Sequence, residues 1–127
     1  MQSKKILITG ASRGIGEAIS FELLQKGFDC IMPSSQELDL NSCESIKGYF
    51  EALNQEIYGL VNNAGINILS VITSLSEEKF DTMMNINLKA PLKLIQEVSK
   101  RMIPNQLGKI VNLSSIWGVR SKEYRTL

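Results

Sequence analysis

The feature that most constrains the fold is a set of three glycines between a short apolar run and an amphipathic helix. Residues 5–9 are apolar and β-rich, and residues 14–26 carry apolar side chains at helical spacing. Gly10 permits a sharp turn, Gly14 permits close approach of a ligand, and Gly16 permits tight helix packing. Free amides at the helix start attract phosphate. We expect a pyrophosphate to contact Gly10, Ser12, Arg13, Gly14, Ile15 and Gly16.

The rest of the chain alternates strand and helix patterns without a repeat or a linker. Further strands are expected at residues 28–32, 37–40, 57–62 and 109–113. Gly27 is expected to end the first helix, and a capping box from Asn41 to Glu44 predicts a helix near Ser42. A long helical stretch from about Glu77 to Met102 contains Pro91, which predicts a kink or a division. Right-handed crossovers then predict one α/β domain over residues 1–127, with a doubly wound parallel sheet.

Composition excludes several classes of function. Fourteen Lys and Arg residues balance thirteen Asp and Glu residues and are scattered along the chain, so nucleic acid is not an expected partner. No apolar run approaches the roughly 18 residues that span a bilayer, and no signal peptide is recognisable, which predicts a cytoplasmic protein without membrane association. Cys30 and Cys43 should then stay reduced. The absence of histidine excludes a Ser-His-Asp triad and an HExxH zinc site, and we assign no metal ligands.

Two motifs resemble those of the short-chain dehydrogenase/reductase family. Thr9 and the three glycines are similar to its Thr-Gly-x-x-x-Gly-x-Gly motif. The second motif is the run Asn62, Asn63, Ala64 and Gly65, which ends a predicted strand. Each motif alone also fits an ordinary turn, but their order and separation favour the family. The resemblance implies a Rossmann fold with strand order 3-2-1-4-5 and a nicotinamide dinucleotide bound at both motifs.

Two further residues resemble members of the family's catalytic set. Asn87, followed by leucine, is similar to an asparagine that holds a water for proton relay, and its neighbour Asn85 lacks that pairing. Ser115, two residues beyond the strand at 109–113, is similar to the serine that polarises a substrate carbonyl, whereas Ser114 occupies a variable position. The ordinary alternatives are a mid-helix asparagine bonded to backbone and a serine pair that ends a strand.

The cofactor type follows from less specific features. Asp39 and Leu40 are similar to the family's pair that contacts adenine, although Asp39 could equally cap the next helix. The second strand ends in Pro33, Ser34 and Ser35, without the acidic residue that binds a ribose 2′-hydroxyl. Arg13 in the glycine turn could pair with a 2′-phosphate. NADP(H) is therefore favoured, with NAD(H) as the alternative.

The chain departs from the family pattern at its end. The family's Tyr-x-x-x-Lys pair is absent, and Tyr124 lies too early to take the tyrosine's role. The resemblance therefore covers only the first half of a typical member, and we expect a truncated chain that is inactive alone. The whole protein would be a homo-oligomer, dimer or tetramer, that acts on a small carbonyl or alcohol. The alternatives are a non-catalytic dinucleotide-binding or interaction protein and, from the short 33–40 link, a sugar-nucleotide-modifying relative.

Overall fold

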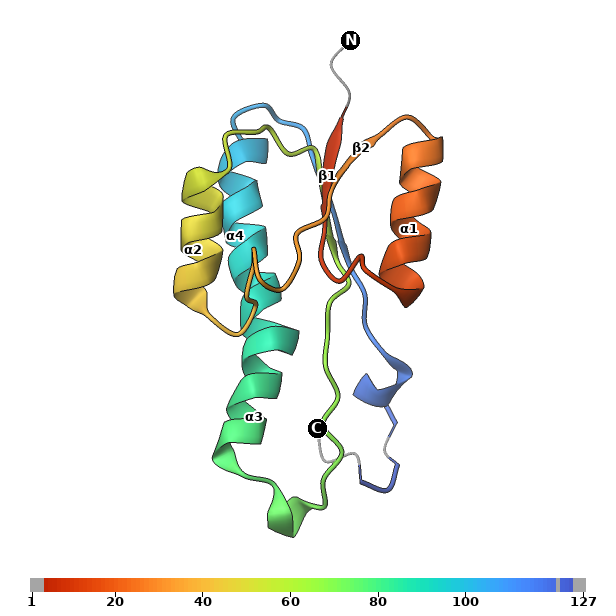
Figure 1. Ribbon diagram of the computed structural model, residues 1–127, viewed down its shortest axis with the longest axis vertical. Helices are drawn as coiled ribbons and strands as arrows, with labels where there is room; N and C mark the ends of the chain where they lie inside the picture. The colour runs from red at the N-terminus through yellow and green to blue at the C-terminus, as the bar shows by residue number, and fades with distance from the viewer. Residues whose placement is uncertain (1–3, 121, 125–127) are drawn as a thin grey trace.

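The computed structural model describes residues 4–120 and 122–124, so Met1 and Leu127 lie outside the described residues. Within that part of the chain, four parallel strands form one sheet between two helical layers (Figure 1). In the order β2-β1-β3-β4, the sheet contains Asp29–Ile31, Lys5–Ile8, Gly59–Asn62 and Lys109–Asn112. Helix α1 (Gly14–Gln25) covers one face, while α2 (Cys43–Ala52) and α4 (Ala90–Met102) cover the other. The predicted α/β class and parallel sheet are confirmed.

The two central strands, β1 and β3, are mostly buried because helices cover both faces of the sheet there, whereas all four residues of the edge strand β4 are exposed. Leu7 and Leu60, which are paired across β1 and β3, point toward α2 and α4 and are almost fully buried. Ile6, Ile8 and Val61 point to the opposite face, where residues of α1 pack against them. Successive side chains of β1 thus contribute to two separate cores, which fixes the sheet between the helical layers.

The strand predicted at residues 37–40 is not formed, so the predicted order 3-2-1-4-5 is wrong at its first position. The other four strands lie in the predicted order. Residues 35–38 form turns in which the Leu38 amide donates to the Ser34 carbonyl (2.9 Å). The Asp39 carboxylate accepts from the Asn41 amide (2.9 Å), which closes a second turn. Local bonds therefore take the place of a strand ladder, and Leu38 is still buried.

The start of α2 also differs from the expected capping box. Ser42 is the N-cap, and its hydroxyl accepts from the Ser45 amide (3.1 Å), whereas the sequence placed the box at Asn41 and Glu44. At the other end of α2, Arg101 of α4 donates to the carbonyls of Phe50 (2.7 Å) and Gln55 (3.0 Å). A guanidinium is favourable there because unpaired carbonyls gather at a helix C-terminus. These bonds tie the two helices of that layer together.

The long helical stretch is divided, as Pro91 predicted. Helix α3 (Glu77–Met84) is capped by Ser76, whose hydroxyl accepts from the Lys79 amide (3.3 Å). A π-helical segment, η2 (Asn85–Lys89), joins α3 to α4. Pro91 has no N–H to donate to the carbonyl four residues earlier, so the regular ladder fails at this point. Among the described residues, no helix is both long and apolar enough to cross a membrane.

Candidate functional site

The glycine turn lies at the carboxyl end of β1, directly before α1. Gly10 has φ +66°, in the left-handed region that favours glycine. Arg13 precedes α1 in extended conformation, and its side chain makes no capping hydrogen bond. The first amides of a helix have no partner within the helix. Without a side-chain cap, those of α1 are available to an anion.

Gly16 is required for the approach of α1 to the turn. A Cβ at this position would lie inside van der Waals contact of the Gly10 carbonyl oxygen and 2.5 Å from Asn63 Nδ2. The Asn63 amide group donates to the carbonyls of Thr9 and Gly10, both at 3.0 Å. The side chain that follows β3 therefore holds the glycine turn in its bend.

Thr9 forms the second link between the two motifs. Its hydroxyl oxygen accepts from the amides of Asn63 (3.2 Å) and Ala64 (3.0 Å), and the hydroxyl lies 3.5 Å from the Val61 carbonyl. Thr9 is only 3% exposed, and a buried hydroxyl is expected to be hydrogen-bonded as this one is. The motifs at residues 9–16 and 62–65 thus form a single hydrogen-bonded unit.

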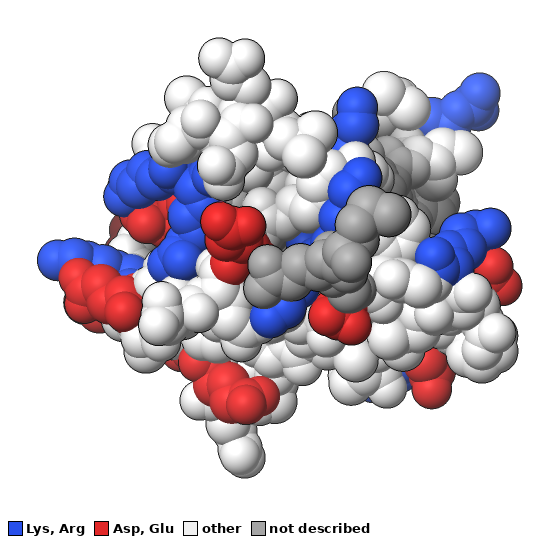
Figure 2. Space-filling view, turned by 90° about the horizontal axis from the view of Figure 1, so that it is seen from above, with Lys and Arg blue, Asp and Glu red and all other residues white. Residues whose placement is uncertain are grey.

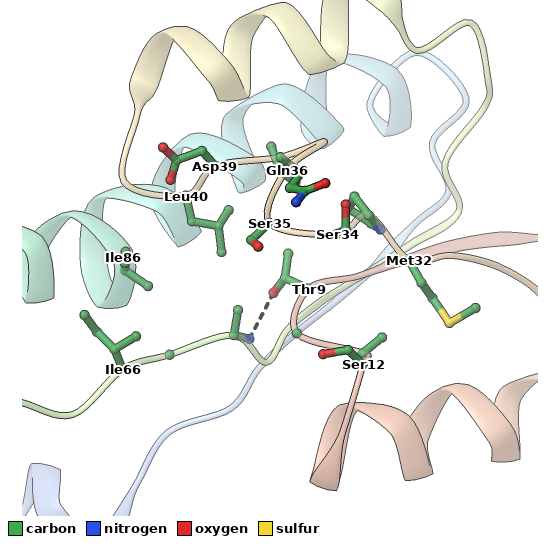
Figure 3. A pocket seen from close by; sticks show the side chains of 16 residues that line it. Thr9, Ser12, Met32, Ser34, Ser35, Gln36, Asp39, Leu40, Ile66 and Ile86 are labelled. Carbon is green, nitrogen blue, oxygen red and sulfur yellow. Dashed lines mark hydrogen bonds between the residues drawn. The ribbon is translucent and has the colours of Figure 1, made fainter.

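A cavity of about 810 Å³ opens beside this unit. Figure 3 shows Thr9 and Ser12 on one side, Ser34, Ser35 and Gln36 of the loop after β2 on another, and Ile66 and Ile86 at one end. The lining consists of Thr9, Gly10, Ala11, Ser12, Met32, Pro33, Ser34, Ser35, Gln36, Leu38, Asp39, Leu40, Ala64, Gly65, Ile66 and Ile86. Its position at the carboxyl ends of the strands is where open α/β sheets bind ligands.

The structure separates the predicted cofactor residues into two groups. Those that line the cavity are Gly10, Ser12, Asp39, Leu40, Ala64 and Gly65. The remainder, which are not among the lining residues, are Arg13, Gly14, Ile15, Gly16, Asn62 and Asn63. Sequence reasoning missed the contributions of Met32, Gln36 and Ile86, although the rule that ligands lie at strand ends points to the residues after β2.

Asn62 is a buried structural residue in this arrangement. It is 5% exposed, and its Nδ2 donates to Asn112 Oδ1 of the neighbouring strand (2.7 Å). Its own Oδ1 is buried and accepts no hydrogen bond from the described residues. The first asparagine of the motif therefore joins β3 to β4, while the second holds the glycine turn.

Asn87 lies in the π-helical segment and binds the chain that leaves β3. Its Oδ1 accepts from the Ile66 amide (2.9 Å), and its Nδ2 donates to the Ile66 carbonyl (2.8 Å). Asn85 makes a different contact, donating to Asn41 Oδ1 (3.0 Å). The two asparagines of this turn are thus distinguished by geometry, and Asn87 is the one that contacts the cavity-lining segment.

Ser115 lies beyond β4, at the start of the short helix η3 (Ile116–Gly118). Its hydroxyl accepts from the Trp117 amide (3.2 Å), and the residue is exposed. That bond uses a lone pair and leaves the hydroxyl proton free to donate. Ser115 is not among the residues that line the cavity.

The opposite end of the sheet carries a different surface. Figure 2 looks onto the end of the molecule at which the chain begins, and lysine and arginine side chains lie interspersed there with acidic ones. This agrees with the net charge of +1. Charge on this visible face is therefore mixed and does not form a basic stripe.

Fold and site together define an α/β domain of the dinucleotide-binding type, with a glycine turn at the first strand–helix junction. The sequence profile of the family described as short chain dehydrogenase matches residues 4–48 and 35–126. The chain therefore belongs to this family. The two matched segments overlap over residues 35–48, which include the positions 37–40 of the expected strand and the start of α2.

Relatives and solved structures agree with this assignment. The chain is 31% identical over 139 positions to the 3-oxoacyl-(acyl-carrier-protein) reductase FabG of Vibrio cholerae serotype O1, covering 93% of this chain and 57% of that protein. It is 36% identical to FabG of Rickettsia conorii, covering 94% and 56%. A structure of 4-hydroxyisoleucine dehydrogenase complexed with NADH superimposes with a TM-score of 0.91 at 31% identity, covering 97% and 60%. The chain spans somewhat more than half the length of the curated relatives it matches.

Proposed function

We propose that the whole protein is an NAD(P)(H)-dependent oxidoreductase that transfers a hydride between the cofactor and a carbonyl or alcohol carbon of a small molecule. The observation that carries this proposal is the hydrogen-bonded unit of the glycine turn and the Asn63–Ala64 segment beside the cavity. Relatives named as a reductase and a dehydrogenase support the reaction class. Because the chain spans part of their length, we propose this activity for the whole protein, with the 127 residues inactive alone.

The site fits a nicotinamide dinucleotide. The uncapped start of α1 leaves backbone amides for a pyrophosphate, to be held by Gly10, Ser12, Arg13, Gly14, Ile15 and Gly16. Asp39 and Leu40 would contact the adenine, and Ala64 and Gly65 the middle of the cofactor, as their place in the lining suggests. When bound, the nicotinamide supplies or accepts the hydride.

Ser115 and Asn87 would serve the reacting end. The free hydroxyl proton of Ser115 would be donated to the substrate oxygen and polarise the carbonyl. Asn87, whose side chain holds Ile66, would keep the chain after β3 in place and organise a water for proton relay. The tyrosine and lysine expected of the family are absent from these 127 residues, so we assign no residue here to the proton transfer itself.

Cofactor type, oligomeric state and cellular location are proposed from separate observations. NADP(H) is favoured over NAD(H), because Arg13 lies in the glycine turn and β2 ends without an acidic residue. A homo-oligomer is proposed because large apolar side chains of the α3–α4 region, Phe80, Leu88 and Leu92, are exposed. A cytoplasmic location is proposed, which fits the two free cysteines, Cys30 and Cys43.

The test is the oxidation of NADPH by the whole protein in the presence of simple ketones. Ser115→Ala should lower the rate about 100-fold or more, as loss of a hydrogen bond to a developing oxyanion does. Ser114→Ala is the matched control, because it removes the neighbouring hydroxyl and should leave the rate close to that of the unaltered protein. Equal rates for Ser115→Ala and Ser114→Ala would refute the role of Ser115.

A further inference from the structure

The loop after β2 contains a carboxylate, that of Glu37, bound to a cavity-lining residue, Ser34; Glu37 itself is exposed and is not among the lining residues. Glu37 accepts from the Ser34 amide and from the Ser34 hydroxyl, both at 2.8 Å. In return, the Glu37 amide donates to the Ser34 carbonyl (3.1 Å) and approaches the Ser34 hydroxyl oxygen (3.3 Å). This is the reciprocal pattern of a capping box, formed here around an isolated turn.

The turn lies where the adenosine ribose is recognised in folds of this type. In such domains, the residue at the end of the second strand contacts the ribose 2′ position. Ser34, Ser35 and Gln36 all line the cavity beyond β2 (Figure 3). Ser34 would therefore face the 2′ position with its amide and its hydroxyl already bonded to a carboxylate.

The carboxylate is charged at neutral pH. The bonds from Ser34, first from its backbone amide and then from its hydroxyl, lower the pKa of Glu37. Its negative charge also reaches Tyr49, whose pKa is raised mainly by burial and further by Glu37. The amide and hydroxyl of Ser34 both already donate to Glu37, so neither is free to bind a phosphate. A phosphate at Ser34 would also lie near the negative charge of Glu37.

We propose that Glu37 sets the discrimination between the two nicotinamide dinucleotides by disfavouring a 2′-phosphate at Ser34. This inference rests on the proposed function, in which Arg13 favours a 2′-phosphate; Glu37 would reduce that preference for NADP(H). β2 ends at Ile31 without an acidic residue, and the turn supplies a carboxylate from Glu37, six positions beyond Ile31 and three beyond Ser34. The sequence alone does not indicate this contact, because it is the turn at residues 34–37 that brings the Glu37 carboxylate back to Ser34.

The experiment measures the affinities of the protein for NADPH and NADH by calorimetric titration, before and after Glu37→Gln. The amide oxygen of Gln can still accept from Ser34, so the turn is retained while the charge is lost. The NADPH to NADH affinity ratio should rise about fivefold, the size expected for removing one repulsion over several ångströms in a water-like dielectric. The affinity for NADH should stay unchanged, and the gain for NADPH should shrink at high salt.

Glu44→Gln is the matched control. Glu44 is also exposed and accepts from a serine hydroxyl (Ser42, 3.3 Å), but Ser42 is not among the cavity-lining residues, whereas Ser34 is. An unchanged ratio in Glu37→Gln, or an equal fall in both affinities, would overturn the inference while leaving the proposed function intact. A folded protein that binds neither cofactor would refute both.

Discussion

Substitution of Gly16 by alanine tests the central geometry most sharply. The added methyl would overlap the Gly10 carbonyl oxygen and lie 2.5 Å from Asn63 Nδ2, so backbone must move. Overpacking of this kind costs about 1–3 kcal/mol. Displacement of the Asn63 amide would also lose its bonds to Thr9 and Gly10, at about 1 kcal/mol each. We expect the free energy of unfolding to fall by about 3–5 kcal/mol in total.

The assay is urea unfolding followed by circular dichroism, with cofactor affinity measured on the same samples. Gly48→Ala is the control, because Gly48 lies in α2 and a methyl group added there would have nothing within 4 Å of it. Alanine should stabilise that helix by about 1 kcal/mol through its helix propensity. If Gly16→Ala were as stable as Gly48→Ala and bound cofactor equally well, the close approach at Gly16 would be wrong.

Three further outcomes are expected. Thr9→Val keeps the shape but removes the acceptor of the Asn63 and Ala64 amides, so chemical denaturation should show a loss of about 2–4 kcal/mol, and an unchanged midpoint would contradict the link. Leu94→Ala, at a side chain 1% exposed, should cost about 2–5 kcal/mol in the same assay, and a loss below that of an exposed Leu92→Ala would contradict its place in the core. The pKa of Glu37 is lowered on folding, so its stabilising effect is present above the ordinary value of 4.5 and lost as pH falls through the folded value. The stability difference between the unaltered protein and Glu37→Gln should therefore vanish in acid, and a difference independent of pH would contradict the Ser34 bonds.

Periodicity and glycine placement predicted most of the fold. Gly27, expected to end the first helix, has φ +81°, and α4 begins at Ala90, immediately before Pro91. The predicted strand at 37–40 failed for a physical reason. Its alternation of apolar and acidic residues fits a strand, but local bonds from Ser34 and Asp39 satisfy the backbone without a neighbouring strand.

The link between β2 and α2 is also short, with eleven residues between Ile31 and Cys43. A short link between β2 and α2 leaves little room for a strand and its turns. Propensity alone could not reveal this, because whether a strand forms depends on a partner edge being reachable.

The site was predicted in part. The sequence locates the two motifs, but it does not show that Asn62 and Asn63 have different partners. The structure shows that Asn62 bonds to Asn112 and that Asn63 bonds to the glycine turn. Neither side chain is among those that line the cavity. The contact between Asn87 and Ile66 depends on the π-helical turn, which no periodicity rule anticipates. The Ser34–Glu37 turn is also not predicted from the sequence, because a serine followed three positions later by glutamate usually indicates the start of a helix.

The most direct test of the account is a calorimetric titration of the folded protein with NADPH and with NADH. We predict saturable binding of a single cofactor molecule per chain, strongly weakened by Gly16→Ala and unaffected by Gly48→Ala. No heat of binding with either dinucleotide, from a protein whose circular dichroism shows the α/β fold intact, would contradict the claim that the glycine turn is a cofactor site.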